Sequence, residues 1–216
     1  MISLTEENYL KMMLHLSKNR GEVSVNELSH ELGIKMPTVN SMMKKLAEKG
    51  FVIYESYKPI RLTDSGRTEA ALVLRKHRLT ETFLFEKMGF GWDQVHPIAE
   101  QIEHIQSIPF FDKMDEMLNY PTIDPHGEPI PSKNGEIILL NYSKLSTCKE
   151  GDIVTFAAVN DPSDEFLQFL DKRNLRLGLK IRIVEKETFD DSMTVSYDKN
   201  RKEILSKLVC DKILIV

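Results

Sequence analysis

The segment SVNELSHELGIKMPTVNSMMKKLAEKGFV, residues 24–52, constrains the fold of this chain more than any other feature. Ser24 and Glu27 have the three-residue spacing of a capping box and predict the start of a short helix, which ends in a turn at Gly33. A second helix follows, which begins at Pro37 or Thr38 and runs through Lys49. Two short helices joined by a tight, glycine-containing turn are typical of a helix-turn-helix.

The residues that follow predict the wing of a winged helix-turn-helix. The sequence FVIYESYKPIRLT, residues 51–63, indicates two short strands about a turn near Tyr57. On this interpretation the second helix enters the major groove of DNA, where short polar side chains suit base edges and lysines suit phosphates. The residues predicted to contact DNA are Lys35, Pro37, Thr38, Asn40, Ser41, Lys44 and Lys45.

The distribution of charge agrees with a local DNA-binding surface in an acidic chain. The formal net charge is −4, which alone argues against nucleic acid. Residues 35–80, however, hold ten lysines and arginines against four acidic residues, a balance of +6, so the remainder carries −10. A basic patch is more often merely solvated, so the charge supports DNA binding without proving it.

The length and composition predict a cytoplasmic, multidomain chain. With 216 residues, of which 41% are hydrophobic, it has room for two or three small domains with ordinary cores. We expect no membrane span and no signal peptide, because no apolar run is long enough and the N-terminus lacks the required order of residues. Cys148 and Cys210 form no C-x-x-C motif, which favours a reducing compartment and buried thiols.

Histidines and carboxylates gather on two neighbouring segments that are expected to be helical. In RKHRLTE, His77 and Glu81 are four residues apart and therefore share one helix face. Imidazole and carboxylate donors without thiolate suit borderline-to-hard divalent cations, although a solvated charged face is the alternative for each residue taken alone. In VHPIAEQIEH, the residues at i, i+4, i+7 and i+8 are His96, Glu100, Glu103 and His104.

The remaining segments predict a helical middle and a β-rich end. Thr63 caps a long helix, a second metal-bearing helix begins at Asp93, and a short helix over residues 109–118 packs against an identical subunit or within the chain. Residues 119–135, rich in proline, form an irregular linker. Beyond Leu140, short strands and one brief helix suggest a small barrel. The expected segments are DIVTFAAV, KIRIVEK, MTVSY and KILIV as strands, and residues 163–171 as the helix.

The chain resembles the diphtheria-toxin-repressor (DtxR) and manganese-transport-regulator (MntR) family of metal-dependent bacterial transcription factors. The motifs that carry the resemblance are MPTVNSMMKKLAEKGFV, LTDSGR, RKHRLTE, VHPIAEQIEH and DPHGEPIP, and residues from TFAAVNDPSDEF onward resemble the SH3-like (FeoA-like) third domain of longer members. The resemblance implies a mainly α fold with a small β part. It divides the chain into a winged helix-turn-helix at 1–72, a helical dimerisation and metal-binding domain with a Pro-rich linker at 73–140, and an SH3-like barrel at 141–216.

The resemblance also implies two metal sites. Lys11 stands in the place of a first-helix glutamate of some relatives, for which Glu7 is a substitute, and Asp124 stands where a cysteine occurs in others. Asn8 replaces an acidic or thioether ligand and adds no negative charge. The primary site is expected at Asn8, Glu100, Glu103 and His104. The ancillary site is expected at His77, Glu81 and His96, with His126, Asp161 and Glu165 as further candidates.

These features predict a metal-dependent repressor that is not an enzyme. The donor set favours Mn(II), with Fe(II) as the alternative and Zn(II), Co(II) or Ni(II) as substitutes in vitro. The family implies that a homodimer binds a palindromic operator when metal links the first helix to residues 100–104. A metal-independent winged-helix regulator that senses a small molecule is the main alternative, and a di-metal enzyme is a lesser one.

Overall fold

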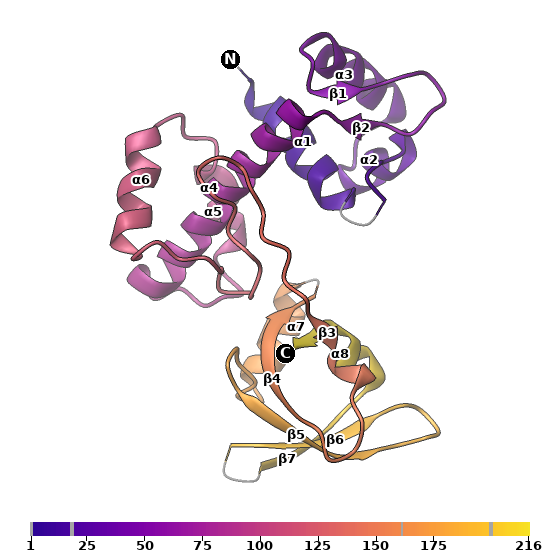
Figure 1. Ribbon diagram of the computed structural model, residues 1–216, viewed down its shortest axis with the longest axis vertical. Coiled ribbons are helices and arrows are strands. Elements are labelled where there is room, and N and C mark those ends of the chain that lie inside the picture. The colour runs from indigo at the N-terminus through magenta and orange to yellow at the C-terminus, as the bar shows by residue number, and fades with distance from the viewer. Residues whose placement is uncertain (1, 18–19, 161, 199–200) are drawn as a thin grey trace. The chain divides into compact units, whose positions relative to one another are not determined.

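The computed structural model describes residues 2–17, 20–160, 162–198 and 201–216, which fall into two compact units (Figure 1). Unit 1 comprises Met1–Thr80, Ile98–Tyr120 and Ile130–Ile138, and unit 2 comprises Glu81–Pro97, Pro121–Pro129 and Leu139–Val216. None of the described helices is both long and apolar enough to cross a membrane. The predicted division into three domains remains a prediction.

Unit 1 begins with two helices whose starts are fixed by capping boxes. Helix α1, Leu4–Leu16, is capped by Ser3, whose hydroxyl accepts from the Glu6 backbone while the Glu6 side chain accepts from the Ser3 backbone. Helix α2, Val25–Glu31, has the same reciprocal arrangement, and the capping box predicted for its start is confirmed. Each box satisfies two backbone N–H groups that a helix end leaves unpaired.

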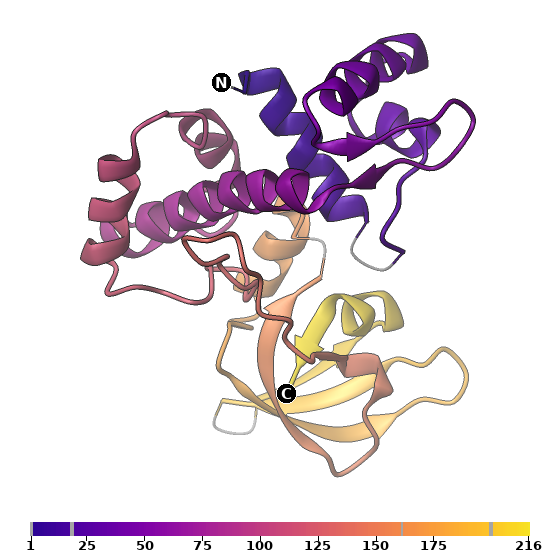
Figure 2. The same ribbon diagram turned by 45° about the horizontal axis from the view of Figure 1, so that its top comes forward.

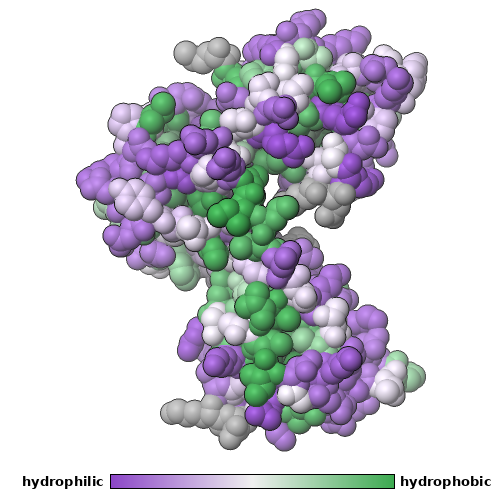
Figure 3. Space-filling model, in the orientation of Figure 1, coloured by the Kyte–Doolittle hydropathy of each residue, from purple (hydrophilic) through white to green (hydrophobic). Residues whose placement is uncertain are grey.

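The winged helix-turn-helix is confirmed. Helix α3, Met36–Glu48, begins just before the expected proline and packs its buried face, which includes Met43 and Leu46, into a core shared with α1 and α2. The wing consists of β1, Val52–Ile53, and β2, Arg61–Leu62, which pair antiparallel. The lobe that carries these elements is mainly hydrophilic on the face drawn in Figure 3.

Three helices follow the wing. Helix α4, Asp64–Met88, begins at the cap predicted at Thr63, whose hydroxyl accepts from the Gly66 backbone at 3.1 Å. Helix α5 is His96–Ile102 and helix α6 is Ile108–Met117. The division between the two units falls within α4, which is continuous from one to the other.

The prediction that the second metal-bearing helix begins at Asp93 is wrong. The Gly91 carbonyl accepts from the Gln94 backbone at 2.9 Å, and the Gln94 side chain accepts from the Gly91 backbone at 3.0 Å, so these residues form a turn. The helix starts only at His96, and Pro97 occupies its first turn, where a missing N–H has no cost. Glu103 and His104 lie in the turn after its end.

Unit 2 is built on an antiparallel sheet of six strands in the order β3-β8-β4-β5-β6-β7. The strands curve strongly in Figure 2, and the sheet encloses buried side chains such as Phe156, Ile181 and Val195. Helix α7, Asp164–Asp171, buries Phe166 and Leu170 in the same core, and its predicted span is confirmed to within one residue. The strands are Ser143–Lys144, Ile153–Val159, Lys180–Lys186, Met193–Tyr197, Arg201–Leu205 and Ile213–Ile215.

Four short elements of the described part of unit 2 were not predicted: β3, β7, helix α8 and the 3-10 helix Leu145–Thr147. Strands β3 and β7 have little hydrophobic patterning, and helix α8, Lys207–Lys212, has only six residues. Strand β7 nevertheless pairs along its whole length with β6, from Tyr197↔Arg201 to Met193↔Leu205. Pairing with a neighbouring strand therefore sets its conformation, which propensity alone does not indicate.

Candidate metal centre and DNA-binding surface

A buried group of donors lies in unit 2, where Glu81, Asp124 and His126 approach one another. Each of the three side chains offers an atom within 4.8 Å of the others, and all three are at most 6% exposed. The Nδ1 atom of His126 is 3.8 Å from Oε2 of Glu81. Two carboxylates and an imidazole, shielded from water, form the donor set that a borderline-to-hard divalent cation prefers.

The orientation of His126 leaves one ring nitrogen suited to a metal. Its Nε2 lies 2.8 Å from the backbone carbonyl oxygen of Trp92, so Nε2 carries the proton and donates to that carbonyl. The lone pair is then on Nδ1, the atom that faces Glu81. The Trp92 ring stacks on the imidazole at a centroid distance of 6.4 Å. Such a fixed tautomer is the usual arrangement behind a metal-ligating histidine.

The loop that carries Asp124 and His126 is held by its own sequence. Oδ1 of Asp124 accepts from the backbones of His126 and Glu128, each at 2.9 Å, which closes a turn. Gly127 has a φ of 89° and no room for a Cβ, which would lie 2.2 Å from the carbonyl oxygen of Ala157. The His126 carbonyl accepts from the Val159 backbone, so the loop is pinned to strand β4.

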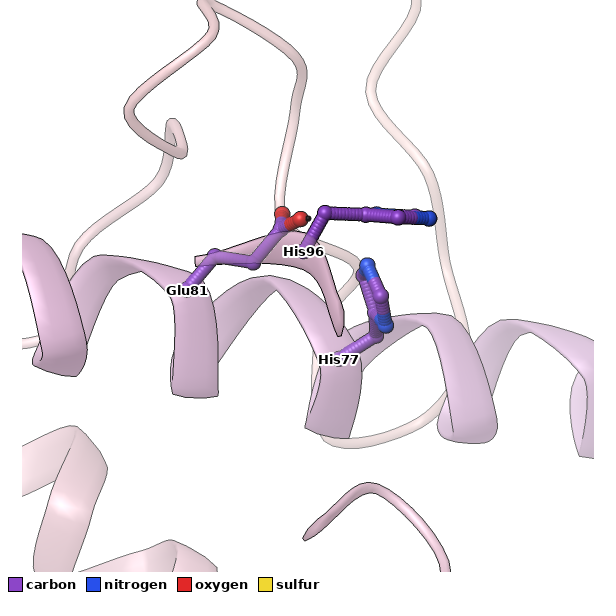
Figure 4. Close-up of side chains that lie close together, drawn as sticks. All are labelled: His77, Glu81 and His96. Carbon is purple, nitrogen blue, oxygen red and sulfur yellow. Dashed lines mark hydrogen bonds and ion pairs between the residues drawn. The ribbon is translucent and has the colours of Figure 1, made fainter. Parts of the chain in front are cut away.

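Two further histidines are associated with Glu81 (Figure 4). His77 lies one turn before Glu81 on the same helix, as predicted, and Nδ1 of His96 lies 3.2 Å from Oε1 of Glu81. His77 is buried, whereas His96 is exposed. Within unit 2 the structure therefore brings both His96 and His126 to Glu81, and His77 lies one turn before Glu81 on α4. The ligand role of each residue remains a prediction.

The group expected as the primary site has a different character, because a lysine lies in it. Glu103 is fully buried, and Nζ of Lys11 lies 2.6 Å and 2.9 Å from its two carboxylate oxygens. His77 Nδ1 lies 2.5 Å from Oε2 of Glu103. Burial alone raises the pKa of Glu103, but hydrogen bonding and charge from His77 and Lys11 outweigh it, so the pKa is lowered from its usual range.

The other members of this group lie around the same ammonium or on helix α1. Oε1 of Glu100 is 3.8 Å from Nζ of Lys11, and Nε2 of His104 is 3.5 Å from Oε1 of Glu103. Nδ1 of His104 lies 2.6 Å from Oε2 of Glu7, which is a buried residue of α1. Asn8 is half-buried on α1. The expected primary site thus contains one buried carboxylate, Glu103, that is already paired with a lysine of the chain.

Of the two third-domain candidates, the structure describes only Glu165, which is in neither group of donors found among the described residues. Glu165 is exposed on α7. Asp161 lies outside the described residues. Asp124 was expected only as the replacement of a cysteine. Its position two residues before His126 could have identified it as a candidate ligand, because the turn between them brings both side chains to Glu81.

The predicted DNA-contacting residues lie along α3. Asn40 is half-buried and its Oδ1 accepts from the hydroxyl of Tyr54 in the wing at 3.0 Å. Nζ of Lys45 lies 3.2 Å from Oε1 of Glu6 on α1. The exposed members of the set are Lys35, Pro37, Thr38, Ser41, Lys44 and Lys45. Residues 37, 38, 41, 44 and 45 have the spacing of one helix face, so they form a continuous exposed surface.

Comparison with known proteins identifies the family to which this chain belongs. Family models match consecutive parts of the chain: "Iron dependent repressor, N-terminal DNA binding domain" over 1–60, "Iron dependent repressor, metal binding and dimerisation domain" over 63–132, and "FeoA domain" over 143–216. A solved structure described as "Manganese-dependent transcriptional repressor complex with manganese" is 31% identical, with a TM-score of 0.89, over 97% of this chain and 98% of that chain. The chain belongs to the DtxR/MntR family of metal-dependent transcriptional repressors.

Other members of the DtxR/MntR family are similar over different extents. The diphtheria toxin repressor of Corynebacterium diphtheriae is 26% identical, over 94% of this chain and 93% of that protein. The iron-dependent repressor IdeR of Mycobacterium tuberculosis is 32% identical, over 59% of this chain and 55% of that protein. Membership of the DtxR/MntR family confirms the predicted metal-dependent DNA-binding repressor and supports neither the small-molecule sensor nor the enzyme. The FeoA match confirms the SH3-like third domain.

Proposed function

We propose that this chain represses genes of metal-ion homeostasis in response to Mn(II), and that Glu81, Asp124 and His126 hold the ion. The observation that supports the proposal is the buried group itself, in which ligand atoms of all three residues lie within 4.8 Å of one another. Two carboxylates and an imidazole favour Mn(II), with Fe(II) as the second candidate and Zn(II), Co(II) or Ni(II) as replacements in vitro. A similar solved repressor is described as a complex with manganese.

The residues present fit such an ion. A bound cation supplies positive charge that neutralises two carboxylates which burial would otherwise disfavour. His126 contributes Nδ1, because Nε2 is engaged with the Trp92 carbonyl. His96, whose Nδ1 lies 3.2 Å from Oε1 of Glu81, and His77, one turn before Glu81 on α4, are proposed as further ligands. A ligand role for Asp161 or Glu165 stays a prediction. Asn8, Glu100, Glu103 and His104 are proposed as a second ligand group.

Helix α1 connects the second ligand group to the recognition helix within unit 1. Oε1 of Glu6 lies 3.2 Å from Nζ of Lys45 on α3 and 2.8 Å from Nζ of Lys49, the residue that caps the end of α3. Glu7, the next residue of α1, contacts His104, and Lys11, about one turn further along, binds Glu103. A shift of residues 103–104 would therefore reach α3 through contacts made by residues 6–11 of one helix. Coupling of this kind is reciprocal, so DNA is expected to tighten metal binding.

We propose that the DNA-binding form is a homodimer on a palindromic operator, in the cytoplasm of a bacterium. A matched family model includes dimerisation among the properties of residues 63–132. Helix α6, within that range, exposes Ile108, Phe110 and Met117, which are apolar side chains suited to burial against a second copy. A two-fold dimer presents two recognition helices to half-sites about one DNA turn apart.

The proposal is tested by metal-dependent DNA binding of the full chain. Operator fragments are selected with the Mn(II)-loaded protein, and their affinity is measured by fluorescence anisotropy at controlled free Mn(II). We expect Mn(II) to tighten binding by about five- to 150-fold, the usual range of allosteric coupling. The Glu81→Gln variant should lose this response, and Glu86→Gln, which changes an exposed carboxylate further along α4, should keep it. Retention of the full response by Glu81→Gln would remove the basis of the proposal.

A further inference from the structure

The ammonium group of Lys11 lies where a cation is required at the second ligand group. It is 2.6 Å and 2.9 Å from the two oxygens of the Glu103 carboxylate and 3.8 Å from Oε1 of Glu100. The Glu103 side chain is fully buried and that of Lys11 is 17% exposed. A buried carboxylate is stable only when a cation or several hydrogen bonds compensate it. Lys11 provides that compensation from within the chain.

Both oxygens of Glu103 are already in use. Oε1 and Oε2 accept from Lys11, and Oε2 also lies 2.5 Å from Nδ1 of His77. A divalent ion that binds Glu103 must compete with the ammonium, because two cations at one buried carboxylate repel each other. The cost of weakening the Lys11–Glu103 ion pair therefore lowers the affinity for metal. Since lysine is fixed to helix α1, it is present at high local concentration whatever the metal content of the cell.

We propose that Lys11 is a built-in cation that competes with divalent metal for Glu103, so the group at Glu100, Glu103 and His104 binds metal much more weakly than the Glu81 group. This inference rests on the proposed function only for the assignment of the tighter ion to Glu81. It also means that α1 is tied to Glu103 when no metal is bound. Metal sensing then depends chiefly on unit 2, and the ion pair holds the first helix in unit 1.

Substitutions of Lys11 separate the effect of its positive charge from that of its position on helix α1. Lys11→Gln removes the positive charge and leaves a polar side chain, one atom shorter, whose amide oxygen can serve as a metal ligand. Lys11→Arg keeps a cation next to Glu103. The two variants therefore differ in whether residue 11 carries a positive charge. Both leave helix α1 equally able to form, because glutamine and arginine have similar helix propensities.

The test is isothermal titration of chelator-treated full chain with Mn(II), together with metal counts on the purified protein. We expect wild type and Lys11→Arg to bind one tight ion per chain. Lys11→Gln should bind a second ion at least tenfold more tightly than wild type does, and adding Glu103→Gln to it should abolish the gain. Lys113→Gln, which breaks an exposed ion pair with Glu116, is the control and should match wild type.

A measurement without metal gives an independent result. In chelator, Lys11→Gln should melt at a lower temperature than wild type and Lys11→Arg, because Glu103 has lost its cation, and Mn(II) should restore its melting temperature. Unchanged ion number and affinity in Lys11→Gln overturn the inference, and so does a variant that fails to fold even with Mn(II), because metal then does not replace the ammonium. A gained ion in Lys11→Gln, with the tight ion retained in Glu81→Gln, supports the role of Lys11 and refutes the assignment to Glu81.

Discussion

Glu6 joins the first helix to the recognition helix, and its removal should destabilise unit 1 in a pH-dependent way. Its side chain is fully buried, and the ammonium groups of Lys49 and Lys45 lie 2.8 Å and 3.2 Å from Oε1. Burial alone raises the pKa of Glu6, but hydrogen bonds from Lys49, the Ser3 backbone and Lys45 together lower it from 4.5 to about 2. The Glu6→Gln variant keeps an oxygen for the Ser3 backbone and removes only the charge.

The size of the effect follows from linkage between protonation and folding. A pKa lowered from 4.5 to about 2 corresponds to about 3 kcal/mol of stabilisation at neutral pH. Because the lysine side chains are 53% and 35% exposed, solvent screening reduces the expected loss to about 2 kcal/mol. The folded-state pKa is below that of the unfolded chain, so the stabilisation is present above pH 4.5 and is lost as the pH falls towards 2.

The assay is denaturant unfolding of wild type and Glu6→Gln in chelator, followed by far-UV circular dichroism at neutral pH and near pH 3. The difference in free energy of unfolding between the two proteins should shrink by more than half at the lower pH. Glu48→Gln, which changes an exposed carboxylate on α3, should match wild type at both values. A Glu6→Gln difference that is the same at both pH values would refute the assignment of the effect to this ion pair.

Two further predictions concern the DNA-binding face and the thiols. Lys44→Ala should weaken binding about equally for all DNA sequences and reduce the slope of log affinity against log salt by about 1, because Lys44 is exposed on α3 in a position suited to phosphate; a loss confined to one sequence would contradict this. Cys210 should resist alkylation at mildly alkaline pH until denaturant is added, since burial, aided by the charge of Asp211, raises the pKa of its thiol to about 12. Mass spectrometry after brief treatment with iodoacetamide provides the measurement, and rapid labelling of the folded chain would refute it.

The parts of the fold that depend on local sequence were predicted, and those that depend on distant contacts were not. The capping box at Ser24 acts between residues three apart, so the sequence itself specifies where helix α2 begins. The error at Asp93 arose because Gly91 and Gln94 bond to each other in a turn instead of starting a helix. No periodicity signals such a bond.

In the candidate metal site, too, the contacts within one helix were predicted from the sequence and the contacts between distant segments were not. Spacing identified Glu81 with His77, because both lie on one helix. It did not place Glu81 next to Asp124 and His126, since that approach depends on a loop folded against strand β4 through backbone bonds. Spacing also gave no sign that Lys11 reaches Glu103, a residue 92 positions away in the sequence.

The contact between Trp92 and His126 has a practical consequence. Trp92 is the sole tryptophan of the chain, its carbonyl accepts from His126, and its indole ring stacks on the imidazole. Any event that alters the charge or position of this imidazole also alters the surroundings of the indole. The fluorescence of Trp92 should therefore change when metal binds at Glu81, Asp124 and His126, so metal binding can be followed without an added dye.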